Sequence, residues 1–479
     1  MSRSLRCWLA LIPAMFFLYF FGLTDVGLLG PDEPRYAAVG REMALSGDWV
    51  TPRLWGTPWF EKPALLYWMI AAANRAGLGM DLAPRLPVVL LSVVFLCSYY
   101  LLLQAEFGRK PALYASIILG ASAMWLAFSQ LGLTDLPMAA FFSLAMLCGL
   151  RWQSTGKHRY LTVAGFLVGM SVLAKGLVPL VLVMPFVWFS RKRWRSLLQP
   201  GPAFAFFVTA TPWYLLCAWR NGWEFLYEFF FRHHVERFTT QALLHSQPFW
   251  FYVPVFFAAL FPWTPTVIPL FQKSFYNDTR RRFLLVWVIF GLVFFSVSIN
   301  KLPGYVLPLL PAAAALAGIA LDEVRDARLM LASACLLLLL VPVVAASLPG
   351  ILVAGGLRRA QILGWNWFFA ITYLALAAVI WLWEEAGRRL SAVALVLFAV
   401  VFGVIYIKIQ CYPVLDREAS ARWLWQRVGH LPAMACIENL ERSWTYGLNY
   451  YAGARVPDCL TTPMPFRIRQ QPGRPPSLD

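Results

Sequence analysis

Long runs of apolar residues, separated by short polar stretches, make up most of the chain. Many of these runs approach the roughly 20 residues that a helix needs to cross the hydrocarbon core of a bilayer. They do not show the strict alternation of polar and apolar positions that membrane β-barrels require. The pattern therefore predicts an all-α polytopic membrane protein. Its thirteen expected spans lie near residues 7–29, 83–104, 111–128, 134–151, 160–175, 176–190, 203–219, 249–271, 283–299, 304–321, 328–347, 366–383 and 390–410.

The composition supports this fold class, since 60% of the 479 residues are hydrophobic and the mean hydropathy is +0.61. The formal net charge of +17 would suggest a nucleic-acid partner, but the distribution of the basic residues argues against one. With the N-terminus inside, the inner connections contain 19 Lys and Arg, against 7 in the short outer connections. This is the asymmetry of the positive-inside rule. The basic excess therefore indicates membrane orientation, and it places the first long loop and the C-terminal tail outside.

Two polar segments stand out from the predicted spans. The first is the long loop at 24–82, in which the apolar segment Pro63–Ala76 is too short to span and predicts a juxtamembrane helix. The second is the tail, so we expect a transmembrane domain at 1–410 and a small extracytoplasmic α/β domain at 411–479. In an oxidising compartment Cys436 and Cys459 could pair to support this small domain, the alternative being that all the tail thiols are free.

The first loop contains the most unusual stretch of the chain, PDEPRYAAVGREMALSGDWVTPRLWGTPWFEKP, from Pro31 to Pro63. It has nine charged residues, although only 14% of the whole chain is charged. Asp32 and Glu33 directly follow the first apolar run, which places them where that helix leaves the lipid. Interleaved aromatic residues suit a loop at the membrane interface. A solvated loop with structural ion pairs is the simpler alternative.

Other polar residues occupy the ends of further spans, and the predicted topology puts all of them on the face of Asp32. Individually they have simpler explanations: Asp135 could cap its helix, and Lys175 could extend to the headgroups. Their gathering on one face indicates an extracytoplasmic active site. The residues are Glu61, Lys62, Asp135 (LTDLP), Lys175 (LAKGL), His233, His234, Glu236, Arg237 (RHHVER), Lys301 and Tyr305 (NKLPGY).

The chain contains neither a P-loop nor a Gly-rich dinucleotide fingerprint. An enzyme that forms bonds outside the cytoplasm needs a substrate that was activated beforehand. A lipid-linked sugar phosphate fits, because its polyprenyl tail can lie along the spans while its phosphate meets Lys and Arg. Fixed cations stabilise the charge that develops on the departing phosphate, and a carboxylate can orient or deprotonate the acceptor.

The motif series PDEPRYA, GDW, FEKP, TDLP, LAKG and KLPGY resembles the bacterial branch of the protein-mannosyltransferase superfamily of GT-C glycosyltransferases. It is most similar to the lipid A aminoarabinose transferases and related undecaprenyl-phosphate-sugar glycosyltransferases, over about residues 1–320. The resemblance implies a GT-C fold in the bacterial inner membrane. It also implies inverting transfer of a sugar from a polyprenyl monophosphate to an acceptor at the periplasmic face, with lipid A or a related glycolipid expected.

By position, the resemblance also implies roles for individual residues. The implied catalytic residues are Asp32, Glu33 and Asp135. The residues implied to bind the donor phosphate are Lys175, Arg237 and Tyr305. The residues implied to bind the rest of the substrates are Arg35, Tyr36, Glu61 and Lys62. No cofactor is certain. A divalent cation stays open, although the connection Gly350–Gly364 has neither His nor acid to bind one.

Three other functions are alternatives to this one. A transporter or flippase of lipid-linked sugars would place its ionisable groups near the membrane midplane, in broken helices of paired repeats, whereas these charges gather at one face. A protein O-glycosyltransferase differs only in its acceptor. A scaffold subunit would leave the pair Asp32 and Glu33 unexplained. We therefore expect an enzyme whose partners are lipids and not nucleic acid.

Overall fold

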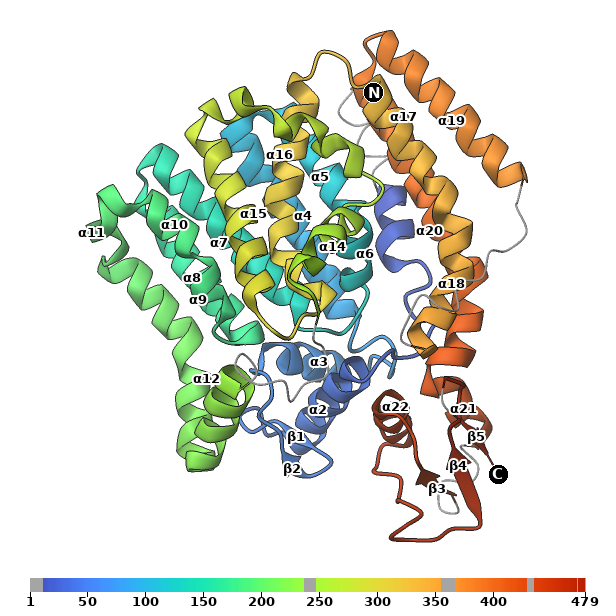
Figure 1. The fold of residues 1–479 in the computed structure, drawn as a ribbon. Coiled ribbons are helices and arrows are strands. Elements are labelled where there is room, and N and C mark those ends of the chain that lie inside the picture. Colours follow the sequence, from blue (N-terminus) through green and yellow to red (C-terminus); the bar gives the residue numbers. More distant parts are fainter. Residues whose placement is uncertain (1–11, 237–246, 355–366, 429–434, 472, 479) are drawn as a thin grey trace.

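The computed structural model describes residues 12–236, 247–354, 367–428, 435–471 and 473–478. The chain forms a bundle of helices, and a set of shorter elements gathers at one end of it, at the bottom of Figure 1. The bundle consists of α4 (Leu86–Phe107), α5 (Arg109–Gly120), α6 (Ala123–Ser129), α7 (Asp135–Thr155), α8 (His158–Lys175), α9 (Val178–Leu182), α10 (Met184–Phe189), α11 (Trp194–Leu197), α12 (Pro200–Leu226), α14 (Tyr252–Ala259), α15 (Thr279–Val297), α16 (Leu310–Glu323), α17 (Arg328–Leu337), α18 (Val341–Ala354), α19 (Trp367–Glu385) and α20 (Arg389–Ala419). The elements at the end are α2 (Asp32–Ser46), β1 (Arg53–Leu54), β2 (Thr57–Pro58), α3 (Leu65–Arg75), α21 (Ala421–Val428), β3 (Ala435–Glu438), α22 (Arg442–Ala452), β4 (Phe466–Arg469) and β5 (Ser477–Leu478).

The prediction of a multi-pass all-α membrane protein is confirmed. Each expected span overlaps a helical segment among the described residues. Six of the described helices are long and apolar enough to cross a membrane, or up to eight if two bent pairs each count as one span. The exact number of thirteen crossings stays a prediction, because several bundle helices are shorter or less apolar than a complete span needs.

The two bent pairs support one another. The first pair, α5 with α6, bends by 64°, and the second, which runs from Phe249 to Phe271, bends by 116°. The sequence FPWTP falls at the second bend, where proline cannot donate the helical hydrogen bond. At the first bend, the backbone N–H of Ala123 donates to the carbonyl of Phe261 at the second, over 2.8 Å. This bond satisfies one backbone group from each bend inside the protein, as a membrane requires.

Helix α16 is the centre of the bundle. In the helical segment that contains it, Pro303–Glu323, 94% of the apolar 18-residue window is buried, more than in the other five described helices that are long enough to cross a membrane. Its small residues (PAAAALAGIAL) allow neighbouring backbones to come close. A Cβ atom at Gly318 would lie 2.4 Å from the backbone nitrogen of Ala115 in α5. A larger residue at Gly318 would therefore push these two helices apart.

The first loop is largely helical. Gly30 turns the chain with a φ of +64°, α2 then begins at Asp32, and Gly47 ends the helix in the left-handed conformation with a φ of +73°. The acids in the first turn of α2 interact favourably with the helix dipole. The sequence did not predict α2, because polar and apolar residues alike are buried on it and no amphipathic period results. The helix predicted within Pro63–Ala76 is present as α3.

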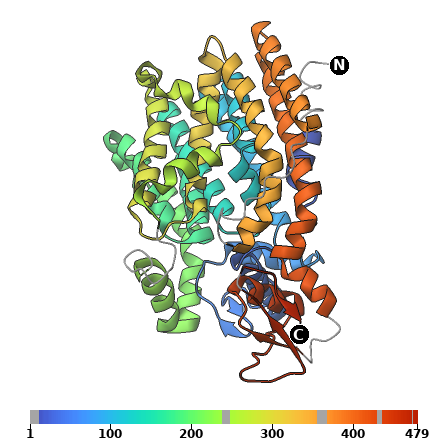
Figure 2. The ribbon, with the colours of Figure 1, turned by 45° about the vertical axis from the view of Figure 1, so that its right-hand side comes forward.

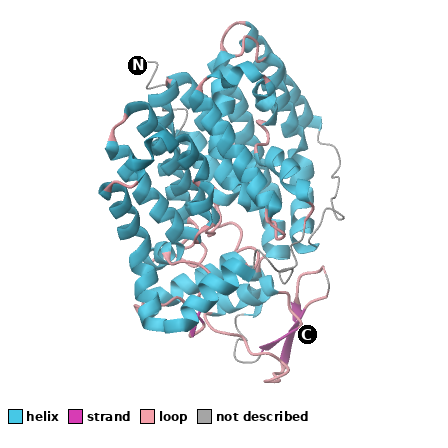
Figure 3. Cartoon of the chain, turned by 60° about the vertical axis from the view of Figure 1, so that its left-hand side comes forward, coloured by secondary structure: helices cyan, strands magenta, loops and turns pink. Residues whose placement is uncertain are grey.

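Helix α20 continues without a break across residue 410, the predicted domain boundary, and ends at Ala419. Beyond it lie α21, α22 and a sheet of order β3–β4–β5, in which β3 and β4 are parallel and β4 and β5 antiparallel. Figures 2 and 3 show this sheet below the end of the bundle, close to the C-terminus. The predicted disulfide between Cys436 and Cys459 is present and confirmed. The division at residue 410 and an independent C-terminal domain stay predictions.

Candidate active site

The charged residues of the first loop form a connected set around Arg35. Its Nη2 atom lies 2.5 Å from Oδ1 of Asp32 and 2.9 Å from Oε2 of Glu61. Nζ of Lys62 lies 3.1 Å from Oε1 of Glu61. The side chain of Arg35 is only 6% exposed, whereas that of Asp32 is 46% exposed. The carboxylate of Asp32 is therefore the exposed member of the set, and the buried guanidinium of Arg35 holds it in place.

Aromatic rings enclose the guanidinium of Arg35. The ring centroids of Tyr36, Trp59 and Tyr446 lie 5.5, 5.4 and 5.4 Å from its Cζ atom, within cation–π range. Burial lowers the pKa of Arg35, but the negative groups nearby, Glu61 first, outweigh it and raise the pKa above its ordinary value. Its Nε atom is buried and has no hydrogen-bond partner among the described residues. Arg35 is thus a permanent cation that still has one donor without a partner there.

Glu33 lies next to Asp32 in the chain but in the opposite environment, with its side chain only 1% exposed. Its carboxylate accepts two hydrogen bonds from Arg85, at 2.8 and 2.9 Å. It also accepts from the backbone N–H groups of Leu29, at 2.8 Å, and Gly132, at 3.0 Å. Both oxygens are therefore occupied within the protein. This geometry favours a structural role for Glu33 in place of the predicted catalytic one.

Asp135, Lys175 and Tyr305 meet in a second set. Asp135 is the first residue of α7 and Lys175 the last of α8, so the antiparallel packing of these helices brings the two together. Nζ of Lys175 lies 2.5 Å from Oδ1 of Asp135 and 5.1 Å from the ring centroid of Tyr305. The two side chains are 14% and 17% exposed. Asp135 therefore pairs with Lys175 and does not cap its helix, whose N-cap is Thr134.

Gly304 of the KLPGY motif makes room for this second set. A Cβ atom there would lie 2.8 Å from Oδ1 of Asp135 and 2.7 Å from the ring of Phe128. Any larger residue would therefore force the Asp135 carboxylate or the Phe128 ring to move. The two sets are also connected through Glu33, which follows Asp32 and bonds to Gly132, three residues before Asp135.

The side chains of the predicted residues His233, His234 and Glu236 are not described by the structure. Arg237 lies outside the described residues. Lys301 is buried and donates to the carbonyls of Ser298, at 2.5 Å, and Gln247, at 3.0 Å, which is a structural arrangement. In the part of the chain that the structure describes, no group of three or more His, Cys, Asp or Glu could hold a metal ion. Among those residues there are therefore no candidate ligands for a divalent cation.

Sequence reasoning did not identify Arg85, Trp59 or Tyr446 as site residues. Arg85 stands at the start of a predicted span, where a basic residue is ordinarily taken for a flank at the headgroups. Trp59 is one of the aromatic residues interleaved in the first loop, and Tyr446 lies in the C-terminal tail among other Trp and Tyr residues. The density of aromatic residues in the first loop and in the tail is the only feature of the sequence that could have indicated a contact between these two segments.

An all-helical membrane bundle with acids and bases gathered at one end is the architecture of the GT-C glycosyltransferases, and comparison with known structures shows this fold. The crystal structure of ArnT from Cupriavidus metallidurans bound to undecaprenyl phosphate matches with a TM-score of 0.79 and 23% identity, over 98% of this chain and 93% of that one. The archaeal oligosaccharyltransferase AglB from Archaeoglobus fulgidus matches with a TM-score of 0.50 and 12% identity, over 96% of this chain and 65% of that one.

The sequence itself is similar to particular transferases. The undecaprenyl phosphate-alpha-4-amino-4-deoxy-L-arabinose arabinosyl transferase of Pseudomonas aeruginosa is 34% identical over 342 residues, 67% of this chain and 61% of that protein. A second transferase of this name, from Proteus mirabilis, is 30% identical over 340 residues, again 67% of this chain and 61% of that protein. The dolichyl-phosphate-mannose-protein mannosyltransferase family matches residues 61–219. The match thus spans about three fifths of these curated relatives, and the predicted resemblance to aminoarabinose transferases of the GT-C class is confirmed.

The structural role of Glu33 can be tested by Glu33→Gln. Loss of its charge leaves Arg85 buried without an ionic partner, and breaking a buried pair typically costs about 3–5 kcal/mol. We expect a large fall in the thermal unfolding temperature of the detergent-solubilised protein, with turnover per folded molecule reduced only a few-fold. Asp32→Asn, a change at a half-exposed side chain, should leave that temperature nearly unchanged. A Glu33→Gln protein as stable as the wild type but inactive would restore the catalytic assignment.

Proposed function

We propose that this chain is an integral-membrane inverting glycosyltransferase. It moves a sugar from a polyprenyl monophosphate, undecaprenyl phosphate in bacteria, to an acceptor at the periplasmic face of the inner membrane, with lipid A or a related glycolipid as the favoured acceptor. The observation that supports this most is the presence, in a bundle of apolar helices, of two charged sets, around Arg35 and around Lys175, that Glu33 connects through Gly132. The name of the Pseudomonas aeruginosa relative and the ligand of the ArnT crystal structure both point to an undecaprenyl phosphate donor.

On the donor side, the polyprenyl chain would lie along the apolar helices while its phosphate meets the cations. Lys175 and Arg35 are mostly buried, so a charge-assisted hydrogen bond from either would be strong. The bond between the anomeric carbon and the phosphate oxygen breaks during transfer, and its electron pair stays on the phosphate. Fixed cations stabilise that growing negative charge and so lower the barrier.

On the acceptor side, Asp32 is the exposed carboxylate of the site. Arg35 holds it in one orientation at 2.5 Å. If the acceptor is a hydroxyl, its oxygen attacks the anomeric carbon and Asp32 receives the hydroxyl proton. If the acceptor is a lipid phosphate, that oxygen is already nucleophilic, and Asp32 acts by positioning it. Glu61 and Lys62, which pair beside Arg35, would line the acceptor.

We also propose that the site faces the periplasm. The positive-inside asymmetry supports this orientation. The disulfide between Cys436 and Cys459 agrees with it, because disulfides persist in oxidising compartments. With thirteen spans and an inner N-terminus, the first loop and the segment 411–479 lie together outside, and residues 1–410 form the transmembrane catalytic domain.

The orientation can be checked by labelling introduced cysteines in spheroplasts with a membrane-impermeant thiol reagent. The background carries Cys97→Ser, because Cys97 is the exposed one among the free cysteines of the described residues. Ser46→Cys and Glu441→Cys should be labelled, since both positions are exposed at the proposed periplasmic end. Lys157→Cys, at an exposed position of a predicted inner connection, should react only after the membrane is opened. Protection of either periplasmic position would contradict the orientation.

The donor assignment predicts that Lys175→Ala weakens binding of undecaprenyl phosphate about tenfold or more, because a hydrogen bond to a charged group is worth roughly 1.5–3 kcal/mol. Lys175→Arg should restore binding only in part, since a planar fork does not replace a point charge. The measurement is a direct binding titration in detergent.

A double variant separates loss of the cation from exposure of its partner. Lys175→Ala leaves Asp135 unpaired, and that carboxylate could itself repel a phosphate. Binding should therefore stay weak in Lys175→Ala with Asp135→Asn if Lys175 holds the phosphate. Recovery of binding in the double variant would show that the phosphate lies elsewhere.

The catalytic assignment predicts that Asp32→Asn retains donor binding but loses turnover. The loss should be ~10²–10⁴-fold if Asp32 removes a proton from a hydroxyl, the usual worth of a general base. It should be smaller and independent of pH if the acceptor is a lipid phosphate. Transfer of radiolabelled sugar to purified lipid A, measured against pH, distinguishes these cases. Glu42→Gln, on the same helix, is the matched control and should stay active. Near-normal turnover of Asp32→Asn would contradict the assignment of the first loop as the catalytic centre.

A further inference from the structure

The C-terminal segment contributes a side chain to the candidate active site. Tyr446 of α22 places its ring 5.4 Å from Cζ of Arg35, so it forms one wall of the aromatic enclosure described above. The other two walls, Tyr36 and Trp59, belong to the first loop itself. Helix α22 also contacts α2 further along, where Nη1 of Arg41 donates to the carbonyl of Tyr450 over 3.3 Å. The enclosure of Arg35 is therefore built from two segments about 400 residues apart.

Tyr446 is held in place by a second aromatic residue. Its ring stacks on Trp55, with the centroids 5.6 Å apart and the planes inclined by 21°. Trp55 lies in the tight turn between β1 and β2 and has a φ of +52°, which is rare for a bulky residue and costs conformational energy. The following Gly56, with a φ of +84°, completes the turn. This strained turn directs Trp55 against Tyr446.

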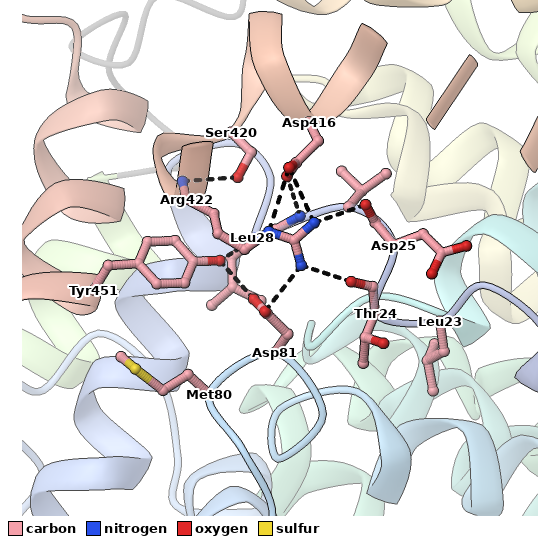
Figure 4. A network of polar contacts seen from close by, with 12 residues as sticks. Leu23, Thr24, Asp25, Leu28, Met80, Asp81, Asp416, Ser420, Arg422 and Tyr451 are labelled. Atoms are coloured by element: carbon pink, nitrogen blue, oxygen red, sulfur yellow. Dashed lines mark hydrogen bonds and ion pairs between the residues drawn. The ribbon is translucent and has the colours of Figure 1, made fainter. Parts of the chain in front are cut away.

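A network of polar contacts, centred on Arg422 of α21, holds Tyr451 of α22 against the first loop (Figure 4). Arg422 donates to the carbonyls of Thr24, at 2.6 Å, and Asp25, at 2.7 Å, and it pairs with Asp81 and Asp416, each at 3.0 Å. It thereby connects the start of the first loop, the end of that loop and the C-terminal segment.

Tyr451 joins the same network from α22. Its hydroxyl donates to Asp81 over 2.6 Å and accepts from the backbone N–H of Leu28 over 2.9 Å. Tyr451 is little more than one helical turn from Tyr446. The position of the Tyr446 ring over Arg35 is thus determined by contacts on both sides of it.

We propose that Tyr446 is a positioning residue of this site: it completes the enclosure of Arg35 and so holds the guanidinium against Asp32 and Glu61. This inference rests on the proposed glycosyltransferase function and assigns the C-terminal segment a part in it. Arginine has a long side chain with many rotamers, and the Nε atom of Arg35 has no hydrogen-bond partner among the described residues. Its orientation therefore depends on the two carboxylates and the surrounding rings. Without the Tyr446 ring, the Arg35 side chain can turn toward water. Turnover should then fall, because small displacements of groups in an active site lower the rate by large factors.

The test compares Tyr446→Ala, Tyr446→Leu and Tyr446→Phe in the full-length protein. A cation–π contact is worth roughly 0.5–2 kcal/mol, so kcat should fall about 2- to 30-fold in Tyr446→Ala and Tyr446→Leu. Tyr446→Phe should keep near-normal turnover, because the contact needs the ring face and not the hydroxyl. Leu fills most of the space without an aromatic face, so it tests the idea even if the Ala variant does not fold. Activity of Tyr446→Leu equal to the wild type would overturn the proposal.

Trp423→Ala is the matched control. It removes the same kind of contact, since the Trp423 ring lies 4.7 Å from Cζ of Arg427, but on α21 and not over Arg35. It should leave kcat within about twofold of the wild type. A loss equal to that of Tyr446→Leu would mean that general disturbance of the C-terminal segment lowers turnover, and would also overturn the proposal.

A double-mutant cycle with Arg35→Gln shows whether Tyr446 acts through Arg35. Gln has no positive charge, so the cation–π benefit of the Tyr446 ring should be absent in that background. In that background, Tyr446→Leu should lower kcat by less than a further factor of about two. A loss of kcat as large as in the wild-type background would contradict the proposal that Tyr446 acts through Arg35. A wild-type protein that transfers no sugar would refute the glycosyltransferase function. An active wild type with an unaffected Tyr446→Leu variant would refute this inference alone.

Discussion

The buried ion pair between Glu33 and Arg85 is the interaction on which the arrangement at this end of the molecule depends. Two charges taken out of water are stabilising only if their remaining hydrogen-bonding capacity is also satisfied. Here it is, because Glu33 accepts from Leu29 and Gly132 besides Arg85. Arg85 donates its other bonds to carbonyls of the residues that precede α2, namely Leu23, Val26 and Gly27. One pair therefore joins the end of the first apolar run, the start of α2, the start of α4 and the turn before α7.

This pair explains how two adjacent acids can have different roles. Asp32 and Glu33 occupy the first turn of α2, where neighbouring side chains point in different directions around the helix. Glu33 points into the junction and anchors the helix, so Asp32 is held at the surface beside Arg35. The second set, Asp135 with Lys175, starts three residues after Gly132, which the same anchor binds. Both charged sets thus take their positions from a residue that is itself unavailable to a substrate.

The same region contains the contacts of the C-terminal segment. Arg422 and Tyr451 bind Asp81, which lies only four residues before Arg85. Arg422 also donates to the carbonyls of Thr24 and Asp25, which lie in the chain between the carbonyls of Leu23 and Val26 that accept from Arg85. The first loop is consequently held from the bundle side by Arg85 and from the opposite side by the C-terminal segment. A charged loop at a membrane surface would otherwise have water as its main partner; here it is held by protein on two sides, which suits a site that must orient a lipid phosphate and a sugar.

The amino-acid sequence by itself determined the class of this protein, because the length and apolarity of a run decide whether it is a membrane helix without reference to the rest of the chain. It also contained the motifs with Asp32, Asp135 and Lys175, and it offered the pairing of Cys436 with Cys459 as one of two alternatives, which the structure decided. Only the tertiary structure decided that Glu33 turns inward to Arg85 and that Tyr446 covers Arg35. Those contacts join residues 52 positions apart in one case and about 400 in the other, and no local pattern encodes which helix faces meet across such separations. They are set by the packing of the whole bundle.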